Sequence, residues 1–152
     1  MILGIDCSSS CVGYTILDNK ARLERIGYIN ISGFEDLLEK AMFLKFMFND
    51  ILANYKIHSV YIEDISKMFH PGFSSAQVIT TLAKFNGMAS FIIYELTNIK
   101  PTYVPASHAR KIAYKRSFQR GIDIKKEIFK EVMKLHPQLV WPKNKNNKML
   151  TY

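Results

Sequence analysis

Apolar and polar positions follow a strand pattern at the start of the chain. Residues 2–6 are apolar up to Asp6, residues 7–11 are small and mostly polar, and residues 12–17 are apolar again. A strand, a tight turn and a second strand are typical of a β-hairpin. Residues 23–31 alternate once more, so the pattern predicts three antiparallel strands in series.

A helical period and a fourth strand come next. Residues 35–52 are predicted to form a helix whose inner face comprises Phe34, Leu37, Leu38, Ala41, Leu44, Phe48, Ile51 and Leu52. Residues 57–62 are predicted to form a strand after this helix, and this strand is expected to run parallel to the first strand. It ends at Glu63 and Asp64. Asp6 and Glu63 are therefore expected to be neighbours at the sheet edge where open α/β sheets bind ligands.

The rest of the pattern predicts a helix, a short strand and two more helices, over 76–97, 101–105, 108–115 and 125–135. Ser107 and Asp123 are the expected N-caps of the last two helices. The helix over 76–97 is apolar all round, which predicts burial on both sides and a dimer contact. The loop over 66–75 carries Phe69 and Phe73, which either tuck under the loop or form an exposed wedge for bases.

Charge is distributed unevenly along the chain, whose formal net charge is +8. Residues 1–99 carry 8 basic and 10 acidic residues, whereas residues 100–152 carry 13 basic and 3 acidic residues. The positive excess in the last third favours a polyanionic partner, with nucleic acid as the first candidate. The alternative is a basic surface without a partner.

Composition excludes several classes of protein. The 152 residues predict a single domain, and the 2 cysteines are too few for a disulfide framework. The four histidines are too scattered for a zinc site, and no apolar segment reaches about 20 residues, the length of a membrane span. We expect a cytoplasmic protein with reduced thiols and without a signal peptide.

Two carboxylates at neighbouring strand ends, together with a basic surface, have a consistent chemical use. Carboxylates bind hard divalent cations, and such cations activate water and neutralise charge at a phosphate. Asp6 and Glu63 are thus candidate ligands in a metal-dependent nuclease. The alternative is that the strand-end acids are structural and pair with a lysine such as Lys67.

Four short segments resemble the RuvC-type Holliday junction resolvases of bacteria and phages, which belong to the ribonuclease H-like superfamily. Ile-Leu-Gly-Ile-Asp at 2–6, with Gly-Tyr at 13–14, resembles the first motif of that family, and Val-Tyr-Ile-Glu-Asp at 60–64 is similar to the second. Residues 104–111 and 121–126 resemble two later segments. The resemblance covers nearly the whole chain in order and spacing.

The resemblance implies a site and its roles. Asp6 and Glu63 would be catalytic metal ligands for Mg²⁺ or Mn²⁺, Asp64 would rank below them, and Lys125 would stabilise charge on the scissile phosphate. The candidate DNA contacts are the two loop aromatics and basic residues of the last third: Phe69, Phe73, Arg110, Lys111, Lys115, Arg116, Arg120 and Lys126.

The resemblance also implies a fold and a partner. The expected architecture is a ribonuclease H-like mixed five-stranded sheet, with three antiparallel strands followed by two parallel ones and with helices on both faces. The implied activity is symmetric nicking of four-way DNA junctions by a homodimer, with the helix over 76–97 as the dimer contact. The expected location is the cytoplasm, that of the host cell if a phage encodes the chain.

One feature departs from the family pattern. The family closes its site with two further aspartates on a final helix, whereas no acidic residue follows Glu131 here. Truncation before that helix, loss of catalysis, or substitution by another acid such as Asp123 would each account for this. Truncation is the favoured interpretation, and this chain is expected to bind junctions but to cut them poorly or not at all.

Three other functions compete with a junction resolvase. An actin-like ATPase or sugar kinase also begins with a strand, an aspartate and a small-residue turn, but it needs far more than 152 residues. A non-catalytic nucleic-acid-binding module would carry purely structural carboxylates. A ribonuclease H-like nuclease for another branched DNA or for an RNA–DNA hybrid is the third alternative, because phosphate contacts do not report the identity of the substrate.

Overall fold

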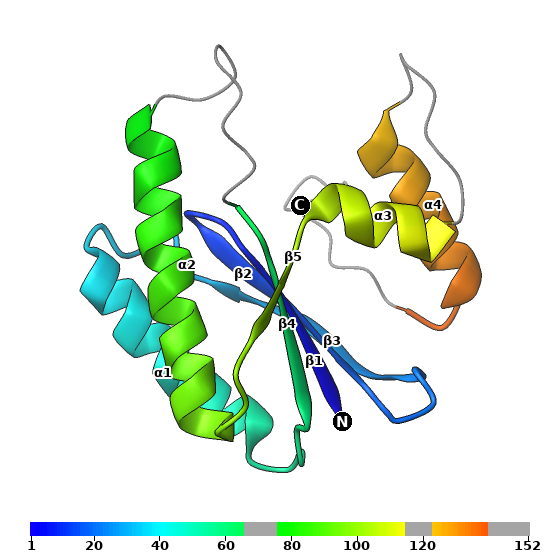
Figure 1. Cartoon of the computed structure of the whole chain (residues 1–152), viewed down its shortest axis with the longest axis horizontal. Coiled ribbons are helices and arrows are strands. Elements are labelled where there is room, and N and C mark those ends of the chain that lie inside the picture. Colours follow the sequence, from blue (N-terminus) through cyan, green and yellow to red (C-terminus); the bar gives the residue numbers. More distant parts are fainter. Residues whose placement is uncertain (66–75, 115–122, 140–152) are drawn as a thin grey trace. The chain divides into compact units, whose positions relative to one another are not determined.

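The computed structural model describes residues 1–65, 76–114 and 123–139 of the chain. The chain divides into two compact units, Met1–Arg110 and Lys111–Tyr152, and the prediction of a single domain stays a prediction. The described strands are β1 (Ile2–Cys7), β2 (Cys11–Leu17), β3 (Leu23–Asn30), β4 (Ser59–Glu63) and β5 (Thr102–Val104), and the described helices are α1 (Leu37–Leu52), α2 (Ala76–Thr97), α3 (Ala106–Tyr114) and α4 (Ile124–Leu135) (Figure 1).

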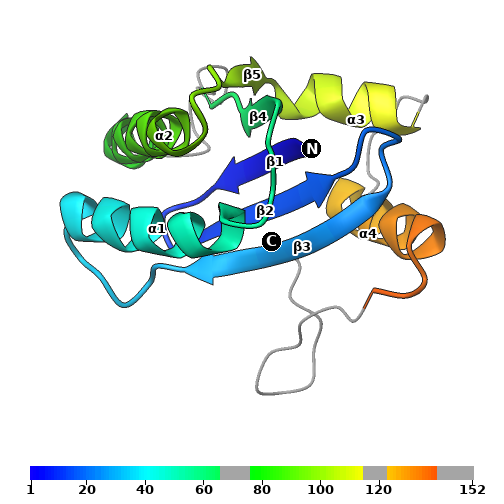
Figure 2. The same cartoon turned by 90° about the horizontal axis from the view of Figure 1, so that it is seen from below.

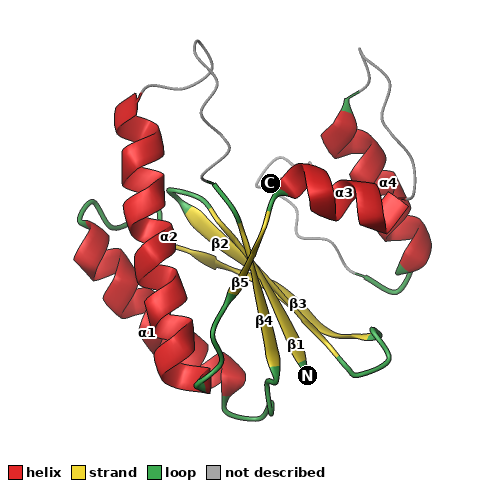
Figure 3. Cartoon of the chain, in the orientation of Figure 1, coloured by secondary structure: helices red, strands yellow, loops and turns green. Residues whose placement is uncertain are grey.

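The five strands form one mixed sheet in the order β3-β2-β1-β4-β5 (Figure 3). Strands β1, β2 and β3 pair antiparallel, whereas β4 pairs parallel with β1 and β5 pairs parallel with β4. This arrangement confirms the predicted order and direction of the strands. It also puts β1, with Asp6, at the centre of the sheet.

Alternation along the central strands separates the core from the opposite face of the sheet. In β1 the side chains of Leu3, Ile5 and Cys7 are buried, and in β4 those of Val60 and Ile62 are buried. These residues share one hydrophobic core with the inner residues of α1 and α2. Helices α1 and α2 pack against each other along this side of the sheet (Figure 2). The intervening residues of β1 and β4 therefore face away from both helices.

Helix α1 begins at a side-chain cap, because the Asp36 carboxylate accepts hydrogen bonds from the backbone N–H groups of Leu38 and Glu39 at 2.7 and 3.2 Å. Its buried residues are Leu44, Phe48, Ile51 and Leu52, as predicted. The prediction was wrong for Leu38, whose side chain is 62% exposed. Leu38 lies in the first turn of the helix and faces a groove between α1 and α2 rather than the core.

Helix α2 has the predicted bounds and two kinds of surface. Its buried residues include two polar ones, Asn86 and Ser90, among Phe85, Ala89, Ile92 and Ile93. Val78, Phe91 and Tyr94 are exposed. The core therefore covers one side of α2, and the exposed side retains apolar residues.

The last two helices begin differently from each other. The predicted cap of α3 was wrong, since Ser107 lies inside the helix and the Pro105 carbonyl accepts hydrogen bonds from the N–H groups of His108 and Ala109 at 2.9 and 3.0 Å. The predicted cap of α4 is confirmed, because Asp123 Oδ1 accepts a hydrogen bond from the N–H of Lys126 at 3.1 Å.

Among the residues that the structure describes, no helix is both long enough and apolar enough to cross a membrane.

Candidate metal and nucleic-acid site

Asp6 and Glu63 lie on adjacent parallel strands and face the same side of the sheet. The register of β1 and β4 ends with the pair Ile5 and Ile62, and each carboxylate belongs to the next residue along its strand. Both isoleucines are buried on the helix side, so alternation directs both carboxylates to the opposite side. Adjacent strands lie about 4.8 Å apart. The structure thus brings together the two acids that the sequence singled out.

The Cys7 thiol lies within the electrostatic reach of both acids. Burial, together with the negative charges of Asp6 and then Glu63, raises the pKa of Cys7 from 9.0 to about 12. Both carboxylates are therefore close enough to act on one sulfur atom. The thiol therefore stays protonated at neutral pH and packs as a small apolar residue. Because only a thiolate ligates metals well, Cys7 is not a candidate metal ligand. Burial and the charge of Asp6 also raise the pKa of the Cys11 thiol.

The turn that follows β1 is held by several hydrogen bonds. The N–H of Ser8 donates to the Cys11 carbonyl at 2.9 Å, and the Ser8 hydroxyl donates to the same oxygen at 2.8 Å. Lys40 Nζ, from α1, donates to the Ser9 carbonyl at 2.7 Å. The N–H of Ile31 donates to the Ser10 carbonyl at 2.9 Å. These bonds fix the end of β1 to its neighbouring elements, and Asp6 lies just before them.

Glycine occupies the position beside Asp6 in β2. Gly13 is the register partner of Asp6, and a Cβ atom there would meet the Asp6 carbonyl oxygen at 4.0 Å, an ordinary contact. The backbone would therefore accept a side chain, which would project beside the Asp6 carboxylate. Glycine at this position adds no such side chain to the face that carries the two acids.

The end of β4 has hydrogen-bond partners on two sides. The N–H of Asp64 donates to the Val104 carbonyl of β5 at 2.9 Å. The side-chain amide of Asn86, in α2, donates to the Glu63 carbonyl at 3.1 Å. Sequence reasoning missed Asn86. A single asparagine within the apolar run from Phe85 to Ile93 was the signal that could have found it, because a buried polar side chain requires a partner.

The remaining predicted site residues are only partly covered by the structure. Arg110 is half-buried and Lys111 is exposed, both in α3, and Lys126 is exposed in α4. Lys125 belongs to α4, although its side chain lies outside the described part of the chain. The predicted DNA contacts outside the described residues are Phe69, Phe73, Lys115, Arg116 and Arg120. The roles of all these residues stay predictions.

The donor set at the strand ends fits a hard divalent cation. Within residues 1–65, 76–114 and 123–139, no group of three or more His, Cys, Asp or Glu side chains is arranged to hold a metal ion. Asp6 and Glu63 form a pair of oxygen donors, and Mg²⁺ is commonly bound by one or two carboxylates together with substrate phosphates. Asp123, the alternative acid, uses its carboxylate to cap α4.

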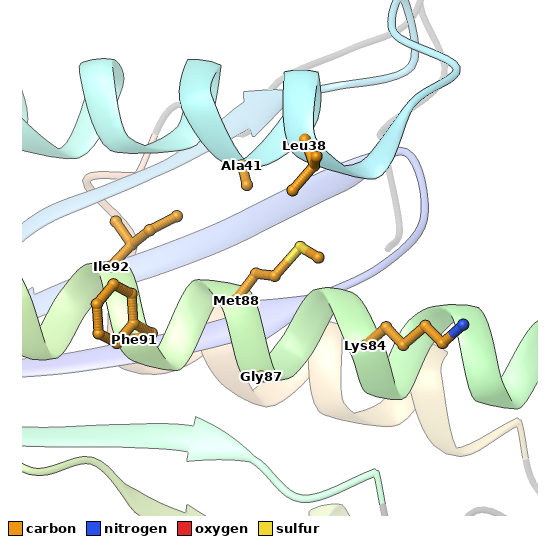
Figure 4. Close-up of a pocket in the computed structure, with 7 residues that line it drawn as sticks. All are labelled: Leu38, Ala41, Lys84, Gly87, Met88, Phe91 and Ile92. Carbon is orange, nitrogen blue, oxygen red and sulfur yellow. The ribbon is translucent and has the colours of Figure 1, made fainter.

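A second surface feature lies between α1 and α2. A groove of about 500 Å³ is lined by Leu38, Ala41, Lys84, Gly87, Met88, Phe91 and Ile92 (Figure 4). Two further apolar residues of α1 are exposed, Met42 at 73% and Phe46 at 71%. Lys45 and Glu95 form an ion pair between the two helices, with Nζ and Oε1 2.8 Å apart.

No protein-family model matches the sequence. Individual proteins do match. The crossover junction endodeoxyribonucleases RuvC of Helicobacter pylori (strain P12) and Helicobacter acinonychis (strain Sheeba) are each 35% identical over 107 residues. The chain resembles RuvC. The matched residues make up 68% of this chain and span 64% of each relative's length.

The folds agree as well. RuvC of Thermus thermophilus, solved in complex with a Holliday junction substrate, superposes with a TM-score of 0.68 over 95% of this chain and 83% of its own, at 14% sequence identity. A second structure of Thermus thermophilus RuvC gives a TM-score of 0.64 at 15% identity. The predicted ribonuclease H-like fold and the resemblance to RuvC are therefore confirmed.

Proposed function

We propose that this chain is a metal-dependent endodeoxyribonuclease that binds four-way DNA junctions. The observation that carries the proposal is the placement of Asp6 and Glu63 on one face, one residue beyond the last register pair of two parallel strands. The likeness to RuvC in sequence and fold supports the same chemistry and the same class of substrate. The proposed site of action is the cytoplasm, that of the host cell if a phage encodes the chain.

The proposed roles in the site follow from the chemistry of the side chains. Asp6 and Glu63 would hold Mg²⁺ or Mn²⁺, which supplies a water of lowered pKa and neutralises charge at the scissile phosphate. Their fixed strand ends keep the two carboxylates oriented before substrate arrives. Lys125 would stabilise negative charge on the phosphate. The protonated thiol of Cys7 takes no part, because its pKa of about 12 keeps it neutral.

Binding of the junction would depend on the basic last third of the chain. Lys111 and Lys126 are exposed and Arg110 is half-buried, so these side chains are the described candidates for phosphate contacts. Such contacts are independent of sequence and weaken as salt increases. Phe69 and Phe73 are the proposed aromatic contacts at the junction, where stacking on a base does not require a particular sequence.

Symmetric nicking requires two active sites, and we place the dimer contact on α2. Its exposed side carries Phe91, at 65% exposed, beside the groove shared with α1. Gly87 lies in the middle of α2, where a Cβ atom would meet no atom within 4 Å. Packing among the described residues of the chain therefore gives no reason for a glycine, which weakens a helix by about 1 kcal/mol relative to alanine. Close approach of a second copy of the chain would give a reason for the glycine.

A binding and cleavage assay at fixed salt tests the proposal. Labelled four-way junction, linear duplex of the same sequence and RNA–DNA hybrid are each titrated with the chain, with and without Mn²⁺. We expect the junction to bind more tightly than the other two. Equal affinity for the duplex would refute junction selectivity, and preference for the hybrid would favour the other ribonuclease H-like nuclease. Nicking of the junction that requires Mn²⁺ would support the proposed metal dependence.

The same assay separates an enzyme from a binding module. Asp6→Asn removes a charge and keeps the size of the side chain, so it should abolish any Mn²⁺-dependent nicking and leave metal-free junction binding intact. If Asp6→Asn leaves both Mn²⁺ binding and nicking unchanged, the carboxylates are structural and the module interpretation holds.

A further inference from the structure

Polar side chains are buried between α2 and the sheet, directly behind the end of β4. Asn86 is 4% exposed and Ser90 is 7% exposed. Their neighbours along the inner face of α2 are apolar and fully buried, with Phe85 at 1% and Ala89 and Ile93 at 0%. Burying an amide costs free energy unless its hydrogen bonds are made. The partners of Asn86 therefore indicate why a polar residue is kept in this position.

The hydrogen bonds of these residues form a chain from β5 through α2 to β4. The Tyr103 hydroxyl donates to Ser90 Oγ at 2.8 Å. The Ser90 hydroxyl donates to the backbone carbonyl of Asn86 at 2.7 Å. Asn86 Nδ2 donates to the backbone carbonyl of Glu63 at 3.1 Å. Every buried side-chain nitrogen or oxygen of the described residues has a hydrogen-bond partner.

The bond from Asn86 reaches the backbone at a specific point. The register of β1 and β4 ends at Ile5 and Ile62, and the Glu63 carbonyl lies one residue further on. The peptide unit that joins Glu63 to Asp64 is bound at both of its polar atoms. Its carbonyl accepts from Asn86, and its N–H donates to the Val104 carbonyl at 2.9 Å.

Fixing this peptide plane fixes the Glu63 side chain. A peptide is planar, so fixing the peptide planes on both sides of Glu63 fixes both its φ and its ψ angle. Strand pairing holds the plane before Glu63. At a strand end without bonds to the following plane, φ and ψ of the last residue are free to vary, and the direction of its Cα–Cβ bond varies with φ. Here the helix and β5 hold the plane from opposite sides. The Glu63 carboxylate is then directed towards the face that carries Asp6.

We propose that Asn86 is a positioning residue, which orients Glu63 for divalent metal binding through the Glu63 carbonyl. The proposal rests on the proposed function of Glu63 as a metal ligand. Asn86 contacts neither the metal nor the substrate. It acts on the backbone, as groups that orient metal ligands from outside the coordination shell do, and loss of such a group typically weakens metal binding by about 10- to 100-fold.

The test compares Mn²⁺ affinity in the full chain and its variants, measured from the free-Mn²⁺ resonance in electron paramagnetic resonance. Asn86→Ala removes the donor, and Asn86→Asp replaces it with an oxygen at nearly constant volume. We expect each variant to weaken Mn²⁺ binding by about tenfold. Metal-free binding of the four-way junction should not change. The ¹³C chemical shift of the Glu63 carbonyl should move in both variants, because that oxygen loses its hydrogen bond.

Ser90→Ala is the matched control. It removes the two hydrogen bonds of the Ser90 hydroxyl, to the Asn86 carbonyl and from the Tyr103 hydroxyl, and leaves the bond from Asn86 to Glu63 in place, so its Mn²⁺ affinity should equal that of wild type. If Asn86→Ala binds Mn²⁺ as wild type does, or if Ser90→Ala weakens binding equally, the proposal is overturned. If Asn86→Asp does not fold, Asn86→Ala decides alone, and the carbonyl shift verifies that the hydrogen bond is lost.

The outcome is distinguishable from failure of the proposed function. A wild-type chain that does not bind Mn²⁺ refutes the metal site and the positioning role together. A wild-type chain that binds Mn²⁺, with Asn86 variants that bind it equally well, refutes only the role of Asn86.

Discussion

Asp6 and Glu63 are one residue beyond the last register pair of β1 and β4, and they face the same side of the sheet. Asp6→Asn and Glu63→Gln should each weaken Mn²⁺ binding by about tenfold or more, because each removes a charged ligand. Asp6 is exposed, so Asp6→Asn should change the free energy of unfolding by less than about 0.5 kcal/mol. Isothermal titration and urea denaturation measure the two quantities. A variant with wild-type Mn²⁺ affinity would show that its carboxylate is not a ligand.

The buried thiol beside these acids predicts a loss of stability at high pH. The pKa of Cys7 is about 12 in the folded chain, against 9.0 ordinarily. Above pH 9 the unfolded chain loses the thiol proton and the folded chain keeps it, so the free energy of unfolding should fall by about 1.4 kcal/mol per pH unit until about pH 12. Below pH 9 this contribution to stability is fully present. Urea denaturation between pH 8 and 11 measures the slope.

The control for that slope is a pair of variants. Cys11→Ser serves as the background, because burial also raises the pKa of Cys11, and Cys7→Ser is then added to it. The slope should shrink on addition of Cys7→Ser. An equal slope in both variants would mean that the Cys7 thiol is not the titrating group. Asp6→Asn should reduce the slope without abolishing it, since burial is the larger cause of the shift.

Gly87 predicts opposite effects on the monomer and on the dimer. Gly87→Ala should stabilise the helix by about 1 kcal/mol, because alanine is the better helix former and a Cβ atom meets nothing there. The same methyl group should weaken self-association by holding the two copies apart. Sedimentation equilibrium measures association, and thermal unfolding at low concentration measures the monomer.

Phe91→Ser is the companion variant, because it removes an exposed apolar side chain from the same groove. It should weaken association and leave the stability of the monomer nearly unchanged. If the wild-type chain is monomeric at high concentration, the proposed dimer contact is wrong. If it is dimeric and neither variant weakens it, the dimer forms through another surface.

Lys111 should contribute to DNA affinity through charge alone. It is exposed in α3, so Lys111→Ala should weaken binding to four-way junction and linear duplex by the same factor. It should also make the slope of log affinity against log salt shallower by about 0.9, as expected for one lost phosphate contact. Fluorescence anisotropy across a salt series measures both effects. Lys45→Ala, which removes a lysine paired with Glu95, is the control and should not change the slope.

The central part of the fold could be predicted because its sequence pattern is local and simple. Alternation over β1, β2 and β3 and a strand after a helix were enough to place Asp6 next to Glu63. Helix α2 was predicted with its observed bounds, since apolar residues fill it from end to end. The ends of other elements depend on contacts that the pattern does not contain. Serine is a favoured N-cap residue, yet Ser107 lies inside α3, and the Pro105 carbonyl accepts the first backbone hydrogen bonds of that helix.

Burial was predicted less well than secondary structure. Leu38 was expected to belong to the core because it is apolar and lies near the start of an amphipathic helix, but it lines the groove between α1 and α2, whereas its neighbour Leu37 packs against the core. Asn86 was missed for the converse reason. Its polarity suggests exposure, and only the three-dimensional position of the Glu63 carbonyl shows what it binds. Tertiary partners decide such cases, and they are distant in sequence.

Because side chains alternate along β1, this one strand supplies core residues to one face of the sheet and a candidate metal ligand to the other. Leu3, Ile5 and Cys7 are buried in the core, whereas Gly4 and Asp6 face the opposite side. Inserting or deleting one residue before Asp6 would exchange the two sets, turning the carboxylate into the hydrophobic interior and the core residues outwards. A change of one residue in the length of this strand therefore removes fold and site together.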